Sequence, residues 1–235
     1  PPPFSEEAAM DIALAFTEAG SGTPLILLHG NGEDGTYFAP HIAALARHFR
    51  VIALDTRGHG KSPRGSAPFT IAQFARDLRD FMDAQGIEKA SLLGFSDGGN
   101  IALTFALAYP DRVDRLILNG ANLDPSGVKP SVQIPIVLDY CLATVLARVS
   151  PRAGRKAELH GLMVREPHIP PSALGHIAAP ALVIAGTHDM IREKHTRLIA
   201  RSLPNSQLEI LPGDHFIART NPEGFRRAVE AFLLA

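Results

Sequence analysis

The residues best suited to chemistry lie in the segment Gly94-Phe95-Ser96-Asp97-Gly98, which is a Gly-x-Ser-x-Gly motif. An apolar run at 90–93 precedes it and a helical pattern follows it, so Ser96 is expected on a tight strand-to-helix turn. Such a turn strains the central residue, and the flanking glycines relieve the crowding around it. The hydroxyl would stand beside a helix N-terminus, where developing negative charge is favoured. Ser96 is therefore the candidate nucleophile.

A serine hydroxyl is a weak nucleophile unless a base takes its proton and an acid orients that base. Asp189 and His215 each follow an apolar run typical of a buried strand, and they follow Ser96 in the order that this architecture uses. Because open parallel sheets place their sites at the carboxyl ends of strands, we expect both side chains at one edge. Two other acids remain open. Asp124 could also reach the imidazole from its own strand end, and Asp214 adjoins His215 and suits a turn.

An attacked carbonyl oxygen becomes negative and needs two preorganised N–H donors. One is the backbone amide of Asp97, directly after the nucleophile. The other is expected from Asn31 in the segment His29-Gly30-Asn31-Gly32, which follows an apolar run at 25–28. Losing one such donor costs about 3–4 kcal/mol of transition-state stabilisation. We expect His29 itself to hold this loop through a hydrogen bond.

Strand-like and helix-like patterns alternate along the chain, which is typical of a mostly parallel sheet with helices on both faces. A capping box at Thr70 and Gln73 begins one helix, and Gly86 ends it. Asn221 before Pro222 marks the start of the last helix. The expected strands are 12–17, 25–28, 51–54, 90–93, 116–118, 181–184 and 208–211.

The stretch 124–179 breaks this alternation, because it carries several prolines and no strand signal. One helix is expected near 136–149. Either it packs on the core, or it forms a lid over a pocket. Its apolar face carries Leu138, Leu142, Val145 and Val149, and Ile134, Val137 and Cys141 widen it.

The composition excludes several classes of protein. The chain has 235 residues, 23 Lys and Arg against 24 Asp and Glu, and a formal net charge of −1. With no basic run longer than two residues, we expect no nucleic-acid partner. The single Cys141 excludes an internal disulfide. No apolar run is long enough to span a membrane, and Pro1–Glu7 lack a signal-peptide pattern, so we expect one domain, a cytoplasmic location and no membrane partner. The oligomeric state is not readable.

Taken together, several segments resemble the α/β-hydrolase superfamily over about residues 11–235. They are His29-Gly30-Asn31-Gly32, the segment 55–62, the Ser96 elbow, the Asp189 segment and Gly213-Asp214-His215. The resemblance implies the α/β-hydrolase fold, a Ser–Asp–His hydrolase and a cap ahead of the acid-bearing strand. On this basis 124–179 is the cap insertion, and 1–123 with 180–235 form the core of a single structural domain.

Within the superfamily, Ser96-Asp97-Gly98-Gly99 and Asn119-Gly120-Ala121-Asn122 resemble the biphenyl-hydrolase-like branch that includes valacyclovir hydrolase. That branch is associated with esters of α-amino acids, and the resemblance implies that the Asp97 carboxylate holds a substrate ammonium. A simpler alternative is that the helix dipole stabilises Asp97 in a first turn, with no substrate involved.

We therefore predict a serine hydrolase of small carboxylic esters that works through an acyl-enzyme without cofactor or metal. Esters of α-amino acids, lactones, thioesters and amides are candidate substrates. Hydrolysis of carbon–carbon bonds in meta-cleavage products and cofactor-free perhydrolysis are catalytic alternatives. A ligand receptor that keeps the hydrolase fold is a non-catalytic one, and an exposed apolar face on the 136–149 helix would favour it.

Overall fold

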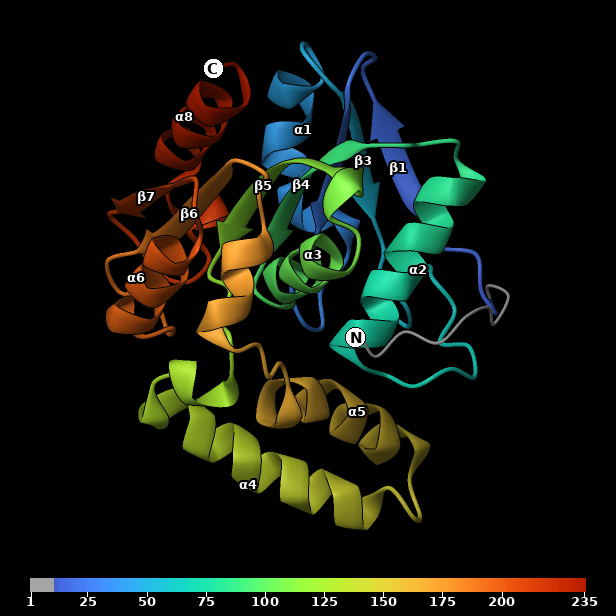
Figure 1. The fold of residues 1–235 in the computed structure, drawn as a ribbon. Coiled ribbons are helices and arrows are strands. Elements are labelled where there is room, and N and C mark those ends of the chain that lie inside the picture. The colour runs from blue at the N-terminus through green and yellow to red at the C-terminus, as the bar shows by residue number, and fades with distance from the viewer. Residues whose placement is uncertain (1–10) are drawn as a thin grey trace.

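A seven-stranded sheet organises the computed structural model, which describes residues 11–235 (Figure 1). The strand order is β1-β3-β2-β4-β5-β6-β7, with β1 antiparallel to β3 and every other neighbouring pair parallel. The predicted mostly parallel sheet is thus confirmed. The strands are β1 (Phe16–Ala19), β2 (Pro24–Leu28), β3 (Arg50–Leu54), β4 (Ala90–Phe95), β5 (Val113–Asn119), β6 (Ala181–Gly186) and β7 (Ser206–Leu211).

The first strand does not begin where the sequence pattern placed it. The prediction of 12–17 is wrong, because β1 starts only at Phe16. Ala15, just before it, donates its N–H to Ser62 Oγ at 2.8 Å and accepts from the Asp55 amide at 2.9 Å. These bonds tie this stretch to the loop after β3 rather than to a neighbouring strand. The residue pattern therefore reflected burial in the core, not pairing in the sheet.

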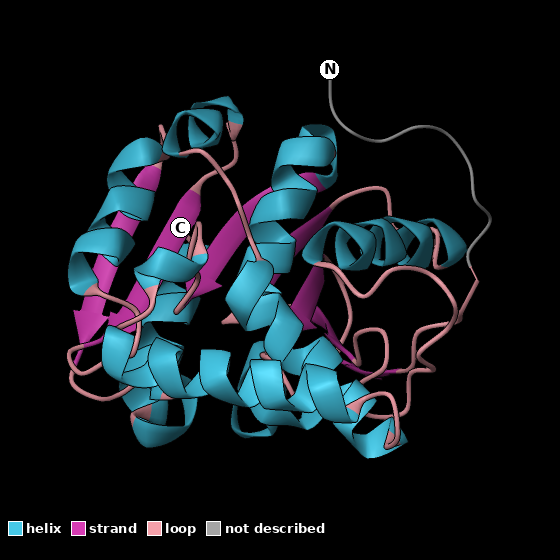
Figure 2. Ribbon diagram, turned by 90° about the horizontal axis from the view of Figure 1, so that it is seen from below, coloured by secondary structure: helices cyan, strands magenta, loops and turns pink. Residues whose placement is uncertain are grey.

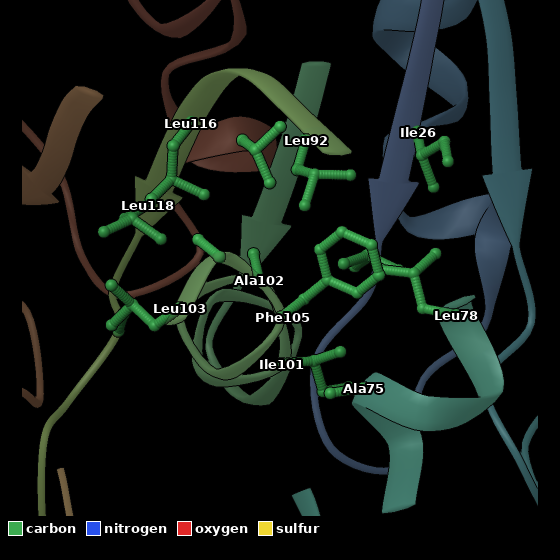
Figure 3. Packing of buried hydrophobic residues seen from close by; sticks show 14 of the residues in the cluster. Ile26, Ala75, Leu78, Leu92, Ile101, Ala102, Leu103, Phe105, Leu116 and Leu118 are labelled. Carbon is green, nitrogen blue, oxygen red and sulfur yellow. The ribbon is translucent and has the colours of Figure 1, made fainter. Parts of the chain in front are cut away.

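Helices cover both faces of the sheet, and Figure 2 distinguishes them from the strands. On one face α2 and α3 pack against the strands, and Figure 3 shows Ile101, Ala102 and Phe105 of α3 in this layer. On the other face α1 and α8 bury a second apolar cluster. The helices are α1 (Ala39–Leu45), α2 (Ile71–Ala84), α3 (Asp97–Ala108), α4 (Pro130–Leu146), α5 (Pro151–Arg165), α6 (Glu193–Ser202), α7 (Ile217–Thr220) and α8 (Pro222–Leu233), and the short 3₁₀ segments are η1 (Gly35–Phe38), η2 (Pro110–Arg112), η3 (Pro125–Gly127) and η4 (Pro171–His176).

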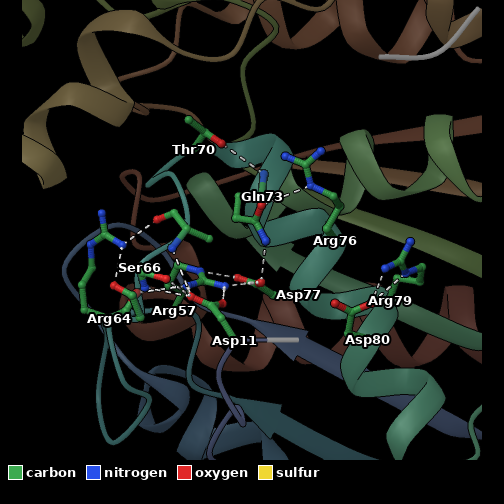
Figure 4. Close-up of polar contacts among 12 residues, drawn as sticks. Asp11, Arg57, Arg64, Ser66, Thr70, Gln73, Arg76, Asp77, Arg79 and Asp80 are labelled. Atoms are coloured by element: carbon green, nitrogen blue, oxygen red, sulfur yellow. Dashed lines mark hydrogen bonds and ion pairs between the residues drawn. The ribbon is translucent and has the colours of Figure 1, made fainter. Parts of the chain in front are cut away.

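The predicted helix starts are confirmed by their caps. Thr70 Oγ1 accepts from the Gln73 amide at 3.1 Å, and Asn221 Oδ1 accepts from the Gly224 amide at 3.1 Å. The Gln73 side chain does not return to Thr70. It donates to Asp77 at 2.9 Å, so only one half of the capping box forms (Figure 4).

Arg57 anchors the loop after β3, which the family resemblance singled out. Its guanidinium is buried and lies 2.6 Å from a carboxylate oxygen of both Asp11 and Asp77 (Figure 4). The Arg57 guanidinium holds the pKa of the Asp11 carboxyl well below its usual range. A buried charge is tolerated when it is paired and hydrogen-bonded in this way. This loop is therefore held by a buried charge cluster.

The stretch between β5 and β6 forms two helices rather than one. The predicted helix at 136–149 exists, but α4 begins at Pro130 and ends at Leu146. The helix α5 was missed at the sequence level. Ser150 caps α5 by accepting from the Ala153 amide at 3.3 Å. The two helices pack on each other, and α4 lies on the side away from the sheet (Figure 1).

The apolar face of α4 is exposed, so of the two alternatives for this helix the structure contradicts packing on the core. Only Ala143 of α4 is buried, because α5 rather than the sheet covers the inner side of the helix. The exposed fractions are 58% for Ile134, 67% for Leu138, 58% for Leu142, 67% for Val145, 44% for Leu146 and 82% for Val149. Across residues 11–235, no helix combines the length and apolar character needed to cross a bilayer.

Candidate active site

Ser96 occupies a strained turn between β4 and α3. Its backbone has φ 54° and ψ −118°, and it is the only non-glycine residue of 11–235 with positive φ. A Cβ atom on Gly98 would lie 2.0 Å from the Leu28 carbonyl oxygen, and one on Gly94 would lie 2.2 Å from the Gly98 oxygen. Only glycine fits at both places. The strained, glycine-flanked serine predicted from the sequence is present in the structure.

The structure brings together the three residues predicted to form a catalytic triad. The distance from Ser96 Oγ to His215 Nε2 is 3.1 Å, and that from His215 Nδ1 to Asp189 Oδ1 is 2.7 Å. Both His215 and Asp189 are buried. Asp189 Oδ1 also accepts from the Ile191 amide at 2.8 Å, which fixes the carboxylate. The arrangement lets the imidazole take a proton from the serine while the carboxylate holds its other nitrogen.

The two rival acids are engaged elsewhere. Asp124 Oδ1 accepts from the Ser126 amide at 2.8 Å and caps η3. Asp214 Oδ1 accepts from the Phe216 amide at 2.9 Å, as suits a turn. The carboxylate in contact with His215 is that of Asp189, at the carboxyl end of β6.

Gly120 makes room for the imidazole. It follows β5 with φ +64°, and a Cβ atom there would lie 2.7 Å from His215 Cε1. On another side, the ring of Phe95 lies with its centroid 4.9 Å from that of His215. The imidazole is thus confined by packing as well as by its hydrogen bonds.

The two predicted oxyanion donors lie on adjoining elements. Asp97 is the first residue of α3, so its N–H belongs to the group that has no acceptor within the helix. Asn31 lies in the loop after β2. The buried His29 holds this loop, since its Nδ1 lies 2.8 Å from the Gly30 oxygen and its Nε2 accepts from the Thr56 amide at 3.0 Å. This placement suits two amides that share one oxyanion.

The Asp97 carboxylate lies among side-chain amides. Asn31 Nδ2 donates to Asp97 Oδ2 at 2.8 Å, and Asn100 Nδ2 donates to Asp97 Oδ1 at 3.2 Å. Burial raises the pKa of the Asp97 carboxyl, and the two amide hydrogen bonds counteract part of that rise. Sequence reasoning identified Asp97 but missed Asn100, whose only signal was its position one turn further along the same helix.

The side-chain amides of Asn31 and Asn100 also link Asp97 to the 124–179 segment. Asn31 Nδ2 also donates to the Leu159 carbonyl of α5 at 2.8 Å. Asn100 Nδ2 donates to Asn122 Oδ1 at 3.0 Å, and Asn122 Nδ2 donates to the Asp124 carbonyl at 2.9 Å. A continuous chain of hydrogen bonds therefore joins the start of the 124–179 segment to its second helix and passes through Asp97, the residue after Ser96.

A second carboxyl group, that of Glu166, is near enough to Asp97 for the two charges to interact. Glu166 Oε2 accepts from the Ile71 amide at 2.6 Å at the start of α2. Burial raises the pKa of Glu166, and the charge of Asp97 adds to that rise. The ion pairs within residues 11–235 include neither Asp97 nor Glu166. Asp97 and Glu166 are thus two carboxyl groups whose pKa values are raised by burial and whose charges interact.

Comparisons with known proteins identify the family of the chain. A family model described as "alpha/beta hydrolase fold" matches residues 23–156. A putative carbamate hydrolase, RutD, from Caulobacter sp. (strain K31) is 32% identical over 240 residues, which cover 89% of this chain and 90% of that protein.

Solved structures are also similar. A thermophilic esterase from Thermogutta terrifontis superposes with a TM-score of 0.78 at 26% identity, covering 94% of this chain and 93% of its own. The enol-lactonase from Burkholderia xenovorans LB400 superposes with a TM-score of 0.81 at 24% identity, covering 97% and 99%. The second likeness shows the fold alone.

Proposed function

Because the chain belongs to the alpha/beta hydrolase family, we propose that it is a serine hydrolase of small carboxylic esters. Ser96 is the nucleophile, His215 the general base and Asp189 the acid that orients it. The observation that carries this proposal is the pair of distances that link the three side chains, 3.1 Å and 2.7 Å. The family supports hydrolysis, and the geometry supports the serine mechanism.

In the first half of the reaction, His215 Nε2 takes the Ser96 hydroxyl proton as Oγ attacks the ester carbonyl. The carbonyl oxygen becomes negative and accepts from the backbone amides of Asn31 and Asp97. His215 then returns the proton to the leaving alcohol, which departs and leaves an acyl-enzyme. Asp189 stabilises the imidazolium that forms between these two steps.

In the second half, water replaces the alcohol. His215 takes a proton from water as its oxygen attacks the acyl carbon, and the same amides hold the oxyanion. His215 then protonates Ser96 Oγ, so the free acid leaves and the enzyme is restored. No step needs a group from outside the chain other than water and substrate.

The finer proposal concerns the charge of the substrate. Side-chain amides from two elements orient the Asp97 carboxylate, and the charge of Glu166 interacts with it. A substrate ammonium would offset a carboxylate held next to a developing oxyanion. Esters of α-amino acids are therefore the substrate class that we propose to test first.

A carbamate is the second candidate substrate, because a relative at 32% identity is named a putative carbamate hydrolase. The same triad could attack the carbonyl of a carbamate ester, so that the alcohol leaves, a carbamoyl-enzyme forms, and water then releases the carbamic acid. A rate comparison between p-nitrophenyl esters and matched p-nitrophenyl carbamates separates the two substrate classes. The same samples are also tested for two further activities. Hydrolysis of meta-cleavage products tests for carbon–carbon bond cleavage, and peroxide-dependent halogenation tests for perhydrolysis.

A fluorophosphonate probe tests the mechanism directly. We expect it to label the wild type at Ser96, and we expect Ser96→Ala to lose both labelling and turnover of short p-nitrophenyl esters. Ser66→Ala, at an exposed serine away from the triad, is the matched control and should label normally. A correctly folded wild type that neither labels nor turns over esters would overturn the proposal and favour a ligand receptor.

A further inference from the structure

The outer face of α4 carries an apolar stripe that nothing within residues 11–235 covers. Of the nine large hydrophobic side chains that are exposed in this part of the chain, six belong to α4 or follow it directly, and they are 44–82% exposed. The five that form the stripe are spaced three or four positions apart, so they lie along one side of the helix. They are Ile134, Leu138, Leu142, Val145 and Val149.

The size of this stripe is unusual for a surface that faces water. The five side chains of the stripe present on the order of 500 Å² of apolar area, which is in the upper range of the largest patch on a typical monomer. Two copies of the stripe facing one another would bury on the order of 1,000 Å², which reaches the lower bound for a specific interface. The stripe is thus large enough to hold a weak dimer together.

The spacing favours another helix as the occupant. From Leu138 onward the apolar positions are separated by four, three and four residues, which is the spacing of a heptad seam. A seam of this kind is complementary to a copy of itself. The only charged side chain within α4 is Asp139, which is turned toward α5, where it pairs with Lys156 at 2.6 Å. No charge therefore interrupts the stripe between 130 and 146.

A lipid surface fits these residues less well. Helices that lie in a membrane interface carry Lys and Arg on their polar face and aromatic anchors on the other. Between Pro130 and Leu146, α4 has no Lys, Arg, Trp or Phe. Attraction to anionic lipid headgroups would therefore have no source on this helix.

We propose that α4 is the surface through which two copies of this chain pair about a two-fold axis, with the two α4 helices antiparallel. The antiparallel arrangement follows from charge. A parallel pair would place Arg148 beside its own copy, whereas an antiparallel pair centred between positions 141 and 142 places it opposite Pro135. Such an interface uses the same patch on both subunits. This proposal does not depend on the chemistry proposed for Ser96.

The two-fold arrangement makes a specific geometric prediction. Cys141 is exposed and is the only cysteine in the chain. In an antiparallel pair it lies next to the two-fold axis, close to Cys141 of the second copy. In a parallel pair shifted along the helix, or in a contact elsewhere on the molecule, the two thiols would be far apart.

The experiment combines light scattering after size exclusion with thiol cross-linking on the full chain. We expect a concentration-dependent mass that approaches twice that of one chain, and a covalent dimer with a short bismaleimide. The double variant Leu138→Glu/Val145→Glu should weaken pairing by about 100-fold or more, because the seam would have to bury carboxylates. Leu234→Glu, at a leucine that is 55% exposed outside the stripe, is the matched control and should pair like the wild type.

Each remaining outcome overturns the proposal. The proposal is overturned if the wild type stays monomeric at every concentration tested. It is also overturned if the double variant still forms the dimer. A wild-type dimer that gives no Cys141 cross-link contradicts the antiparallel arrangement. Binding of the wild type, but not of the double variant, to phosphatidylcholine–phosphatidylserine vesicles would make a lipid surface the occupant. Circular dichroism melts of each variant show whether it is folded.

Discussion

Asn31 Nδ2 lies 2.8 Å from Asp97 Oδ2, so a side chain from the loop after β2 contacts the residue that follows the nucleophile. The same amide nitrogen donates to the Leu159 carbonyl of α5. One amide group therefore joins the loop of the proposed oxyanion hole, the Ser96 turn and the cap segment.

Asn31→Ala keeps the backbone amide proposed to bind the oxyanion and removes only the side-chain contacts. Hydrogen bonds to charged groups contribute about 1.5–3 kcal/mol, so we expect kcat/KM to fall by about 10- to 100-fold. Steady-state ester hydrolysis measures this. Asn205→Ala, at an exposed asparagine far from the site, should leave the rate unchanged. Equal kcat/KM values for Asn31→Ala and wild type would show that the side chain positions nothing.

Asp97→Asn removes the charge proposed to hold a substrate ammonium. We expect the wild type to hydrolyse an ester with a free α-amino group faster than its N-acetylated counterpart. The variant should narrow that ratio by about 10- to 100-fold, since the lost interaction is a hydrogen bond to a charged group. Each ratio compares two substrates on the same enzyme, so a loss of activity that affects both substrates equally leaves the ratio unchanged. An unchanged ratio would leave Asp97 with a structural role only.

The choice between the two candidate triad acids is open to a paired test. Asp189→Asn should lower kcat by about 10⁴-fold, because the imidazole loses the partner that fixes its tautomer. Asp124→Asn should change kcat by only a few-fold and stability by about 1 kcal/mol, since that side chain caps η3. The reverse result would assign the acid to Asp124.

Gly120→Ala tests how closely packing confines His215. The new methyl group would lie within 3 Å of the imidazole, at a backbone position with positive φ. We expect kcat to fall by about 100-fold or more, because small displacements of a catalytic group are costly. Gly175→Ala, where a Cβ atom meets nothing within 4 Å, is the control. Wild-type kcat in a folded Gly120→Ala would contradict the geometry.

Buried histidines should make the fold sensitive to acid. Burial lowers the pKa of His59 to about 4, and burial also lowers the pKa values of His29, His41 and His195. Below about pH 6.5 the unfolded chain binds protons that the folded chain does not, so stability falls as the pH falls toward the folded pKa. Each such histidine contributes up to about 1.4 kcal/mol per pH unit in that window.

Urea unfolding between pH 7 and pH 5 measures this slope. His59→Gln should make the slope shallower, because the Gln side chain does not titrate and can still accept from the Gly32 amide, as His59 Nε2 does at 3.2 Å. His48→Gln, at an exposed histidine, is the control. A slope in His59→Gln equal to that of the wild type would show that His59 is not a source of the acid sensitivity.

Local patterns were enough to predict six of the seven strands and the turn that carries Ser96. An apolar run, a glycine-flanked serine and a helical pattern are features of adjacent residues, so they are legible without the fold. The first strand was misplaced because burial alone gives the same apolar spacing as sheet pairing. The helix α5 was missed because it carries Gly154 and Gly161, which weaken a helix pattern.

The sequence by itself determined the mostly parallel sheet, the candidate nucleophile and the order of the proposed triad residues, because each depends on neighbours along the chain. Only the tertiary structure decided that Asp189 rather than Asp124 lies against His215, and that side-chain amides from two elements, Asn31 and Asn100, meet at Asp97. It also decided that the apolar face of α4 points outward. Those outcomes depend on distances between residues far apart in the chain, and those distances are set when the elements pack together.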